Sequence, residues 1–270
     1  DYDRLIVTEP ANKAPVDMKL HCLIKLNRMD QALSFVRTAV KKFPGDKSIG
    51  MNAILVLREK KCFQEALPLI DRLIAGFPED HNLYVKKSEI LVDCDRTREA
   101  LKLISSRIEK ARAGKNRNVL LAYLVNRAYI YRILMLNDEA LRDLDEAIAV
   151  DPENGSLYSQ KALIYSGEKR VDLVIKTMDK AIAINPRNPE SYQTAGFLLM
   201  GTPGRFPQAL EYYTKAVKFG AQHLTVYSHL AQIHESLGNY EEALANVKQA
   251  IARSGHDHFS EKMQLARLLS

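Results

Sequence analysis

Two glycines have the spacing that nucleotide-binding proteins use to hold a phosphate. Gly196 and Gly201 are separated by four residues, as in a phosphate-binding loop. Thr202 and Pro203 follow them, although that loop needs Lys and then Ser or Thr at these places. The segment also lies within a predicted pair of helices and not after a strand. We therefore expect no nucleotide site here.

Histidines are the other residues with the chemistry for catalysis or metal binding. His229 and His234 are five residues apart, so they do not share a helix face as a metal-binding pair would. His256 and His258 flank Asp257 and would need further ligands from elsewhere. No nucleophile or metalloprotease motif is present. The sequence therefore predicts no catalytic residues, no metal site and no cofactor, and we expect that the chain is not an enzyme.

The three cysteines are odd in number and lack the paired spacing of metal ligands. Cys62 and Cys94 fall in the turns of neighbouring predicted helix pairs, and stacked helices lie about 8–10 Å apart. A disulfide allows at most roughly 7 Å between Cα atoms. We therefore favour free thiols, including Cys22, in a reducing compartment such as the cytoplasm over a disulfide.

The elements that carry these residues follow a 34-residue period. Ala32 and Ala66 begin Ala-Leu steps one period apart, and Pro44 and Pro78 each follow twelve residues later. In residues 139–150, apolar side chains recur at the spacing of one helical face. Small residues let paired helices approach closely, and Pro ends the second helix. This period predicts a stack of helical hairpins that bury one another's apolar faces.

The period divides residues 13–257 into seven predicted repeats, with six additional residues, 115–120, before the fourth. The repeats are 13–46, 47–80, 81–114, 121–154, 155–188, 189–223 and 224–257. Residues 1–12 are similar to the end of a preceding repeat, and the first residue is not Met, so we expect a piece of a longer array or a processed product. Residues 258–270 are expected to form a capping helix or the start of another repeat.

Residues at fixed positions of each unit resemble those of the tetratricopeptide repeat family. Tyr84, Tyr158 and Tyr192 stand at the fourth position, where the family places a large residue, and Ala147 and Ala181 stand at the twenty-seventh. Tyr takes the place of Trp, which the chain lacks. The resemblance implies an all-α fold, a right-handed superhelical solenoid of stacked antiparallel helical hairpins. It also implies a groove, lined by the first helix of each repeat, that binds a peptide or partner protein.

Two segments depart from the repeat. Arg112 replaces the expected Pro of repeat 81–114, so we expect the second helix to continue to Gly114, with this glycine as a left-handed cap. The added residues then predict a wider spacing or altered twist before the fourth repeat. The basic segment 107–117 is either a patch for phosphates, RNA or an acidic partner, or a solvated helix end. Residues 201–209 form an enlarged turn that either reaches over the groove or is an insertion without function.

The net charge of +6 lies in residues 1–120, where Lys and Arg exceed Asp and Glu. A basic half of a solenoid attracts nucleic acid or an acidic tail, but ordinary surface variation explains the excess as well, and we favour that explanation. No apolar run of 18 residues occurs, so no membrane span is predicted. The sequence indicates no oligomeric state.

The positions that face the groove in the family predict the partner-binding residues of this chain. These residues are Asn52, Lys86, Asn126, Tyr129, Arg132, Gln160, Gln193 and Phe197. Asn and Gln side chains can hydrogen-bond an extended peptide, and aromatic side chains can anchor it. We expect the principal contact in the fourth to sixth repeats, which are the most regular. Alternatively, Tyr129 and Phe197 pack between helices and contribute only stability.

Co-chaperone members of the family hold a C-terminal carboxylate with two Lys, two Asn and an Arg. The corresponding positions of the first three repeats hold Asp17, His21, Asn52, Asn82 and Lys86. Only Asn52 matches outright, and Lys86 matches approximately. A heat-shock-protein tail is therefore not the expected partner.

The whole sequence predicts a non-catalytic protein–protein interaction scaffold within a larger protein or complex. Two other functions stay open. The chain is alternatively the substrate-targeting arm of a multidomain enzyme, or an RNA-binding protein that uses its basic N-terminal half.

Overall fold

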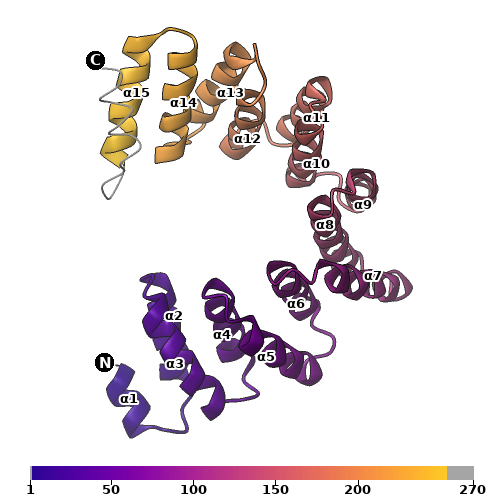
Figure 1. Ribbon diagram of the computed structural model, residues 1–270, viewed down its shortest axis with the longest axis vertical. Coiled ribbons are helices and arrows are strands. Elements are labelled where there is room, and N and C mark those ends of the chain that lie inside the picture. The colour runs from indigo at the N-terminus through magenta and orange to yellow at the C-terminus, as the bar shows by residue number, and fades with distance from the viewer. Residues whose placement is uncertain (1, 254–270) are drawn as a thin grey trace. The chain divides into compact units, whose positions relative to one another are not determined.

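The computed structural model describes residues 2–253, and all regular secondary structure in this range is α-helical. Fifteen helices follow one another here, joined by short turns (Figure 1). They are α1 (Tyr2–Thr8), α2 (Ala14–Lys25), α3 (Met29–Lys42), α4 (Lys47–Glu59), α5 (Phe63–Gly76), α6 (His81–Asp93), α7 (Thr97–Ala113), α8 (Arg117–Ile133), α9 (Asn137–Val150), α10 (Gly155–Gly167), α11 (Val171–Ile184), α12 (Pro189–Met200), α13 (Phe206–Lys218), α14 (Leu224–Ser236) and α15 (Tyr240–Arg253). The predicted all-α class is confirmed. The helix predicted at 258–270 and His256 and His258 lie outside the described residues.

Consecutive helices pair as hairpins, for example α2 with α3, α4 with α5, and α12 with α13. The first helices of successive hairpins also contact one another, as α2 contacts α4, α6 contacts α8, and α10 contacts α12. We call the surface formed by these first helices the first-helix face. It consists of α2, α4, α6 and α8, and separately of α10, α12 and α14.

The chain divides into two compact units, residues 1–135 and 136–270. The division lies between α8 and α9, inside the predicted repeat 121–154. Unit 1 therefore contains α1 to α8, and the described part of unit 2 contains α9 to α15. Each unit has a buried apolar core of its own.

The turn inside each hairpin contains one residue with left-handed backbone. In the described residues this position holds Asn27, Lys61, Asp95, Met135, Lys169, Gly204 and Gly238. The next amide then reaches back to the helix: Cys62 N donates to Leu57 O at 2.7 Å. Such a turn closes the helix end with backbone hydrogen bonds. The left-handed conformation costs most non-glycine residues about 1–2 kcal/mol and Asn and Asp less, so the turns at Lys61, Met135 and Lys169 are strained in the same way.

The end of α7 differs from the prediction. The helix continues to Ala113, as the missing Pro suggested, but Gly114 is right-handed, with φ of −77°. The left-handed residue is Lys115, with φ of 53°, and its N–H donates to Arg112 O at 3.1 Å. Gly114 was thus wrongly predicted as the left-handed cap, because the helical turn continues one residue further. The added residues lengthen both α7 and α8 to 17 residues.

The Pro near the end of a repeat is linked to the Tyr at the fourth position of the next. Tyr84 Oη donates to Pro78 O at 2.8 Å, and Tyr192 Oη donates to Pro186 O at 3.0 Å. Backbone carbonyls beyond a helix end have no partner within the helix. The Tyr hydroxyl therefore satisfies a carbonyl while its ring is buried in the core.

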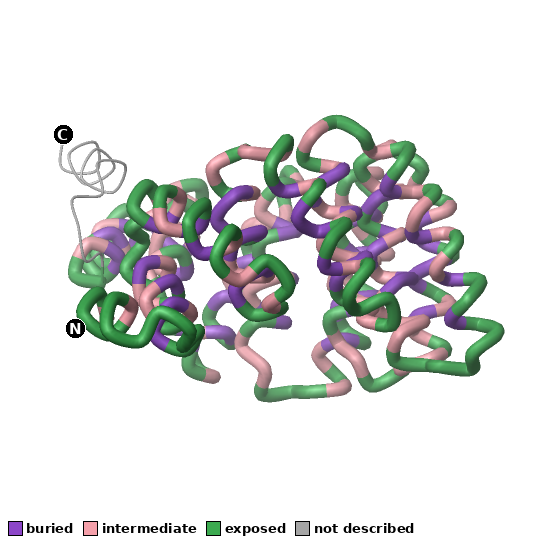
Figure 2. Tube along the Cα trace, turned by 90° about the horizontal axis from the view of Figure 1, so that it is seen from below, coloured by how far each residue is buried: buried purple, intermediate pink, exposed green. Residues whose placement is uncertain are grey.

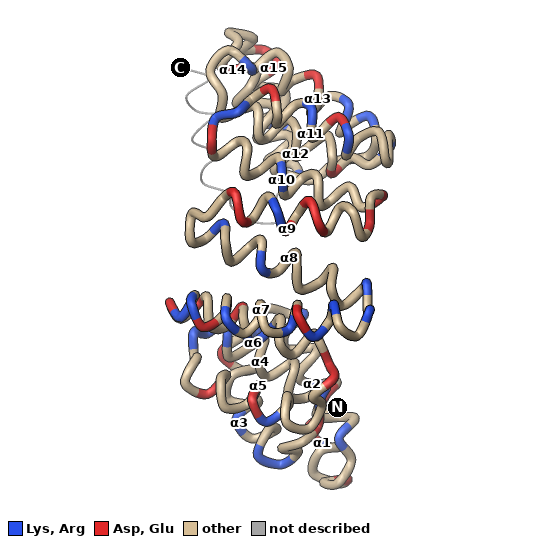
Figure 3. The backbone as a smooth tube through the Cα atoms, turned by 90° about the vertical axis from the view of Figure 1, so that its right-hand side faces the viewer, with Lys and Arg blue, Asp and Glu red and all other residues tan. Residues whose placement is uncertain are grey.

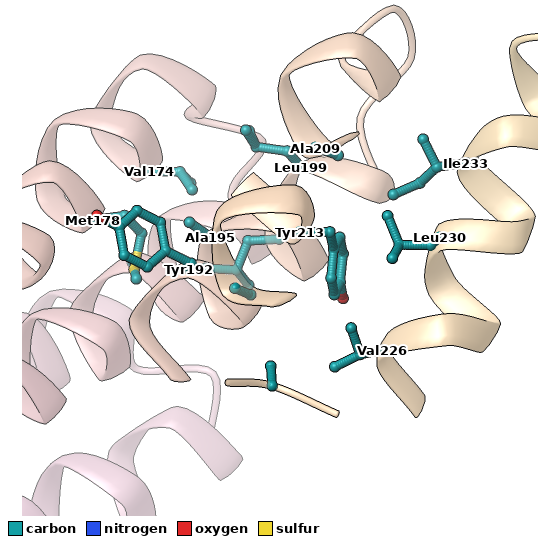
Figure 4. Close-up of a cluster of buried hydrophobic side chains, with 14 of the residues drawn as sticks. Val174, Met178, Tyr192, Ala195, Leu199, Ala209, Tyr213, Val226, Leu230 and Ile233 are labelled. Carbon is teal, nitrogen blue, oxygen red and sulfur yellow. The ribbon is translucent and has the colours of Figure 1, made fainter. Parts of the chain in front are cut away.

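Buried residues line the sides of helices that face neighbouring helices (Figure 2). The small residues predicted at close helix contacts, such as Ala140 and Ala147, are fully buried. In unit 2 the ring of Tyr213 on α13 fills the core and faces Leu230 on α14 (Figure 4). A Cβ on Gly196 would lie 2.6 Å from that ring, so α12 and α13 approach each other where only glycine fits.

Candidate functional site

Unit 1 has a hollow of about 830 Å³ between α4 and α6, beside the turn that leads into α5. Its lining combines apolar, amide and charged side chains. The lining residues are Met51, Asn52, Ile54, Leu55, Arg58, Glu59, Lys61, Phe63, Lys86 and Asp93. Ligand sites are commonly hollows of several hundred Å³ with few polar groups on an apolar wall.

Arg58 is the centre of a charged network in this hollow. Its Nη1 donates to Glu89 and its Nε donates to Asp93, so α4 and α6 are joined across the first-helix face. Lys86 Nζ also donates to Glu89 Oε2, at 2.9 Å. Two cations and two carboxylates therefore balance here, and the remaining N–H groups of Arg58 and Lys86 can contact a ligand.

Asn52 is oriented by an acidic residue of the preceding repeat. Its Nδ2 donates to Asp17 Oδ1 at 2.9 Å, and Ser48 Oγ donates to Asp17 Oδ2 at 2.6 Å. The amide oxygen of Asn52 therefore stays an acceptor for a peptide N–H. Asp17 places negative charge beside Asn52, which opposes binding of another carboxylate at this place.

Apolar side chains on the same face of unit 1 are open to solvent. Met18 on α2 is 53% exposed, and Leu55 on α4 is 47% exposed. Helices α2 and α4 contact each other, so these two side chains lie on neighbouring helices. Exposed apolar groups beside a polar network are typical of contact surfaces for partners.

The predicted residues of α8 divide into a buried and an exposed set. Asn126 is buried, and Ser88 Oγ on α6 donates to its Oδ1 at 2.7 Å. Tyr129 is 39% exposed, and the Arg132 guanidinium lies 5.4 Å from its ring centroid. Tyr129 and Arg132 are thus presented together, whereas the Asn126 oxygen is used inside the fold.

In unit 2, the predicted Phe197 is 55% exposed and packs against His229, with ring centroids 5.6 Å apart. Tyr213 Oη lies 2.7 Å from His229 Nδ1. Burial raises the pKa of the Tyr213 phenol and lowers the pKa of His229, so both groups are neutral. The phenol keeps its proton and donates a hydrogen bond to Nδ1 of the imidazole. His229 Nε2 then carries the N–H and is a donor beside Phe197. Gln160 and Gln193 are half-buried on α10 and α12.

The part of the chain that the structure describes holds no group of three His, Cys, Asp or Glu residues with the arrangement of a metal site. Among the same residues, no helix is both long and apolar enough to cross a membrane.

Sequence models of the tetratricopeptide repeat match residues 155–188 and 204–258. These residues of the chain are therefore tetratricopeptide repeats. No curated protein matches its sequence. The named family agrees with the hairpins and the turn geometry described above.

Solved structures resemble this tetratricopeptide repeat protein in fold. A tetratricopeptide repeat protein from Parabacteroides merdae matches with a TM-score of 0.61 at 17% identity, covering 100% of this chain and 99% of the other. The C-terminal part of a repeat protein from Cytophaga hutchinsonii matches with a TM-score of 0.58 at 16% identity, over 80% and 83% of the two chains. A chain of the APC/C hetero-tetramer Cut9–Hcn1 matches with a TM-score of 0.54 at 14% identity. The matched region covers 99% of the present chain and 52% of the chain from that complex.

Sequence reasoning missed part of the hollow in this tetratricopeptide repeat protein. Asn52 and Lys86 were predicted, but Arg58, Phe63 and Asp93 were not. Phe63 and Asp93 lie outside the positions that the prediction used. Arg58 stands at the twelfth position of its repeat, where Arg132 was predicted in the repeat 121–154, but the prediction did not extend that position to the repeat 47–80. One signal was present, because Arg58 follows Leu55 by three residues and therefore shares its face of α4.

Proposed function

We propose that this chain is a non-catalytic scaffold that binds an extended peptide segment of a partner protein on its first-helix face. The observation that carries the proposal is the hollow of about 830 Å³ in unit 1, which combines an apolar wall with oriented polar groups. Tetratricopeptide repeat proteins generally serve protein–protein interaction. The hollow supports the proposal because it offers apolar and polar groups on one surface.

The chemistry of the hollow suits a peptide. Leu55 and Met51 offer an apolar surface for a side chain, and the Asn52 oxygen accepts a backbone N–H. Lys86 and Arg58 supply donors for backbone carbonyls. Because Asp17 lies beside Asn52, an internal peptide segment fits this face better than a C-terminal carboxylate.

Further contacts are proposed at the other predicted residues. Tyr129 and Arg132 in unit 1, and Phe197 with Gln193 in unit 2, present aromatic and polar groups on first helices. Aromatic and Arg side chains are the groups that most often dominate binding energy at interfaces. Each unit therefore offers its own candidate contact.

Nucleic acid is the less favoured partner, because many basic residues of unit 1 already have acidic partners. Lys13 pairs with Asp46, Arg37 pairs with Glu65 at 2.7 Å, and Lys47 pairs with Asp80. Charged residues of both signs lie along α7 in unit 1 and along α9 in unit 2 (Figure 3). Phosphate binding needs cations that are free to replace counterions.

The three cysteines are unpaired, which supports the cytoplasmic location expected from the sequence.

The test is selection of peptides from a displayed random library, followed by affinity measurements on variants. We expect Leu55→Asp to weaken the selected peptides about tenfold or more, because it places a charge on the apolar wall. Tyr129→Ala with Arg132→Ala tests the second contact in unit 1. Tyr240→Asp is the matched control, because Tyr240 is exposed and lies outside the hollow.

The proposal requires that peptides are selected and that the control variant binds them as the unaltered chain does. Failure to select any peptide contradicts peptide binding. Selected peptides whose affinity is unchanged by Leu55→Asp and by the Tyr129 and Arg132 variant would place the site away from the first-helix face of unit 1.

A further inference from the structure

A second pocket, in unit 2, lies between α9, α10 and α11 and has a volume of about 260 Å³. Its lining residues are Asp145, Ile148, Tyr158, Lys161, Tyr165, Leu173, Lys176, Thr177 and Lys180. On α10 the stripe of Tyr158, Lys161 and Tyr165 is roughly opposite to Gln160, since successive residues turn by about 100°. The pocket is therefore separate from the first-helix face of this unit.

Three lysines and one acid line this pocket. Lys161 is mostly buried, with a side chain 17% exposed, and its Nζ pairs with Asp145. Lys176 and Lys180 are exposed and one turn apart on α11, and neither has an acidic partner within residues 2–253. Like charges at this spacing repel each other. An anion between them would relieve that repulsion.

Thr177 provides a second and independent feature of the pocket. The residue is only 7% exposed, and its hydroxyl makes no hydrogen bond to any described residue. Fully enclosed side-chain polar atoms in the described part of the chain all have partners, so the Thr177 hydroxyl is not sealed in the core but opens to the pocket that it lines. A hydroxyl that opens to the pocket and makes no bond within the described residues can donate to a ligand oxygen there.

The equivalent pocket one repeat later is a natural comparison. It lies between α11, α12 and α13 and contains Asp179, Glu211 and Lys215 among its lining residues. Lys215 Nζ donates to Glu211 Oε1 at 2.7 Å, and Tyr212 Oη donates to Asp179 Oδ1 at 3.1 Å. The pocket between α11, α12 and α13 therefore has an excess of acids, and the oxygens of these acids already accept hydrogen bonds. The excess of lysine is therefore a property of one repeat and not of the fold.

We propose that the pocket lined by Lys176, Thr177 and Lys180 binds a carboxylate side chain from an acidic segment of a protein partner. Two unpaired ammonium groups and one hydroxyl donor match the acceptor oxygens of a carboxylate. A phosphate group fits less well, because neither Arg nor a helix N-terminus lines the pocket and Asp145 repels a doubly charged phosphate more strongly than a singly charged carboxylate. This site lies outside the hollow of unit 1, so it does not depend on the peptide site proposed there.

The test uses the whole chain and a fluorescein-labelled hexapeptide of alternating Gly and Glu, measured by fluorescence anisotropy at low salt. The Lys176→Gln and Lys180→Gln double variant is expected to bind about tenfold more weakly, since charge-assisted hydrogen bonds are lost. The control is Lys218→Gln with Lys248→Gln, which removes the same charge from exposed lysines elsewhere in unit 2. We expect the control to bind within about twofold of the unaltered chain.

Thr177→Val gives a readout that bulk charge does not affect. It should weaken binding of the Glu peptide, because it removes the hydroxyl donor and keeps the charge of the pocket and the shape of the side chain. The proposal is overturned if the unaltered chain does not bind the Glu peptide, or if it binds the matching Gln peptide equally well. It is also overturned if both lysine double variants lose the same affinity, or if a phosphoserine peptide binds more tightly than the Glu peptide.

Discussion

The two units join their successive repeats with different chemistry. In unit 1, Asp46 caps α4 by accepting from Ile49 N at 3.0 Å and also pairs with Lys13 of the preceding repeat at 2.6 Å. Asp80 caps α6 and pairs with Lys47 in the same way. In unit 2 the cap of α12 is Asn188, and Gly155 stands where the lysine would be.

Unit 2 uses aromatic contacts at these joints. Tyr213 on α13 packs on His229 on α14, in the next repeat, with ring centroids 5.4 Å apart. Within the repeat 189–223, Tyr192 also stacks on Phe219 at 5.3 Å, which stiffens the hairpin that presents Tyr213. The same 34-residue hairpin can therefore be joined by ion pairs or by rings, because the backbone arrangement comes from the small residues and the turns. The two kinds of joint should respond differently to overpacking and to pH.

The largest effect is expected from filling the space of a glycine in each unit. Gly196→Ala should cost about 1–3 kcal/mol of unfolding free energy, because the new Cβ meets the Tyr213 ring, which hydrogen-bonds to His229 and cannot easily move. Gly50→Ala should cost about 1 kcal/mol or less, because its Cβ meets only the end of the Leu73 side chain and alanine favours the helix.

Chemical denaturation of the two alanine variants measures this difference. Equal losses would show that the aromatic joint of unit 2 is no more rigid than the aliphatic contact in unit 1.

The turns should behave alike in the two units, although the joints differ. Lys61→Gly in unit 1 and Lys169→Gly in unit 2 should each raise stability by about 1 kcal/mol, because both residues have left-handed backbone. Gly238→Ala should lower it by a similar amount, since Gly238 has φ of 79°. Thermal unfolding of the three variants checks this expectation, and opposite signs for the two lysine variants would contradict it.

Acid should weaken the joints of unit 1 selectively. Burial tends to raise the pKa values of Asp46 and Asp80, but hydrogen bonds from their lysines and from backbone N–H groups outweigh it and hold both pKa values below the ordinary range. A carboxyl group with a lowered folded-state pKa contributes stability above the pKa of the unfolded chain, near 4, and loses it as the pH falls through the folded value.

Replacing both residues in the Asp46→Asn and Asp80→Asn double variant separates the ion pair from the cap, because Asn caps a helix about as well as Asp. At neutral pH we expect a loss of about 0.5–1 kcal/mol for each pair, and near pH 3 we expect the difference from the unaltered chain to shrink. Amide hydrogen exchange in α4 and α6 reports this change. A loss that is the same at both pH values would rule out the ion pairs as its source.

The helices and their pairing could be predicted, because small residues, tyrosines and prolines recur at fixed places whose roles are local. The residue at position 147 must be small because two helices pack closely there, and Ala147 is fully buried. The Tyr192 hydroxyl donates to the carbonyl of Pro186, which is only six residues earlier. The left-handed cap at the end of α7 could not be predicted, because its position depends on where the last backbone hydrogen bonds of the helix form. The left-handed residue is Lys115.

The candidate site was less predictable, because it depends on contacts between helices. Asn126 occupies a groove position by family pattern, yet it is buried because Ser88 of a neighbouring helix donates to it. Tyr129 is 39% exposed and Phe197 is 55% exposed, and a contact role for these two residues stays a prediction. Thr177 has no sequence signature at all, since its significance comes from a missing partner.

The central claim is that a peptide lies in the hollow of unit 1. The most direct measurement is photo-crosslinking to a library-selected peptide from a benzoylphenylalanine placed at Leu55, compared with one placed at Arg72 on α5, which is exposed and outside the hollow. We expect a crosslink from position 55 that unlabelled peptide competes away, and none from position 72. A crosslink from position 72 with none from position 55 would contradict the claim.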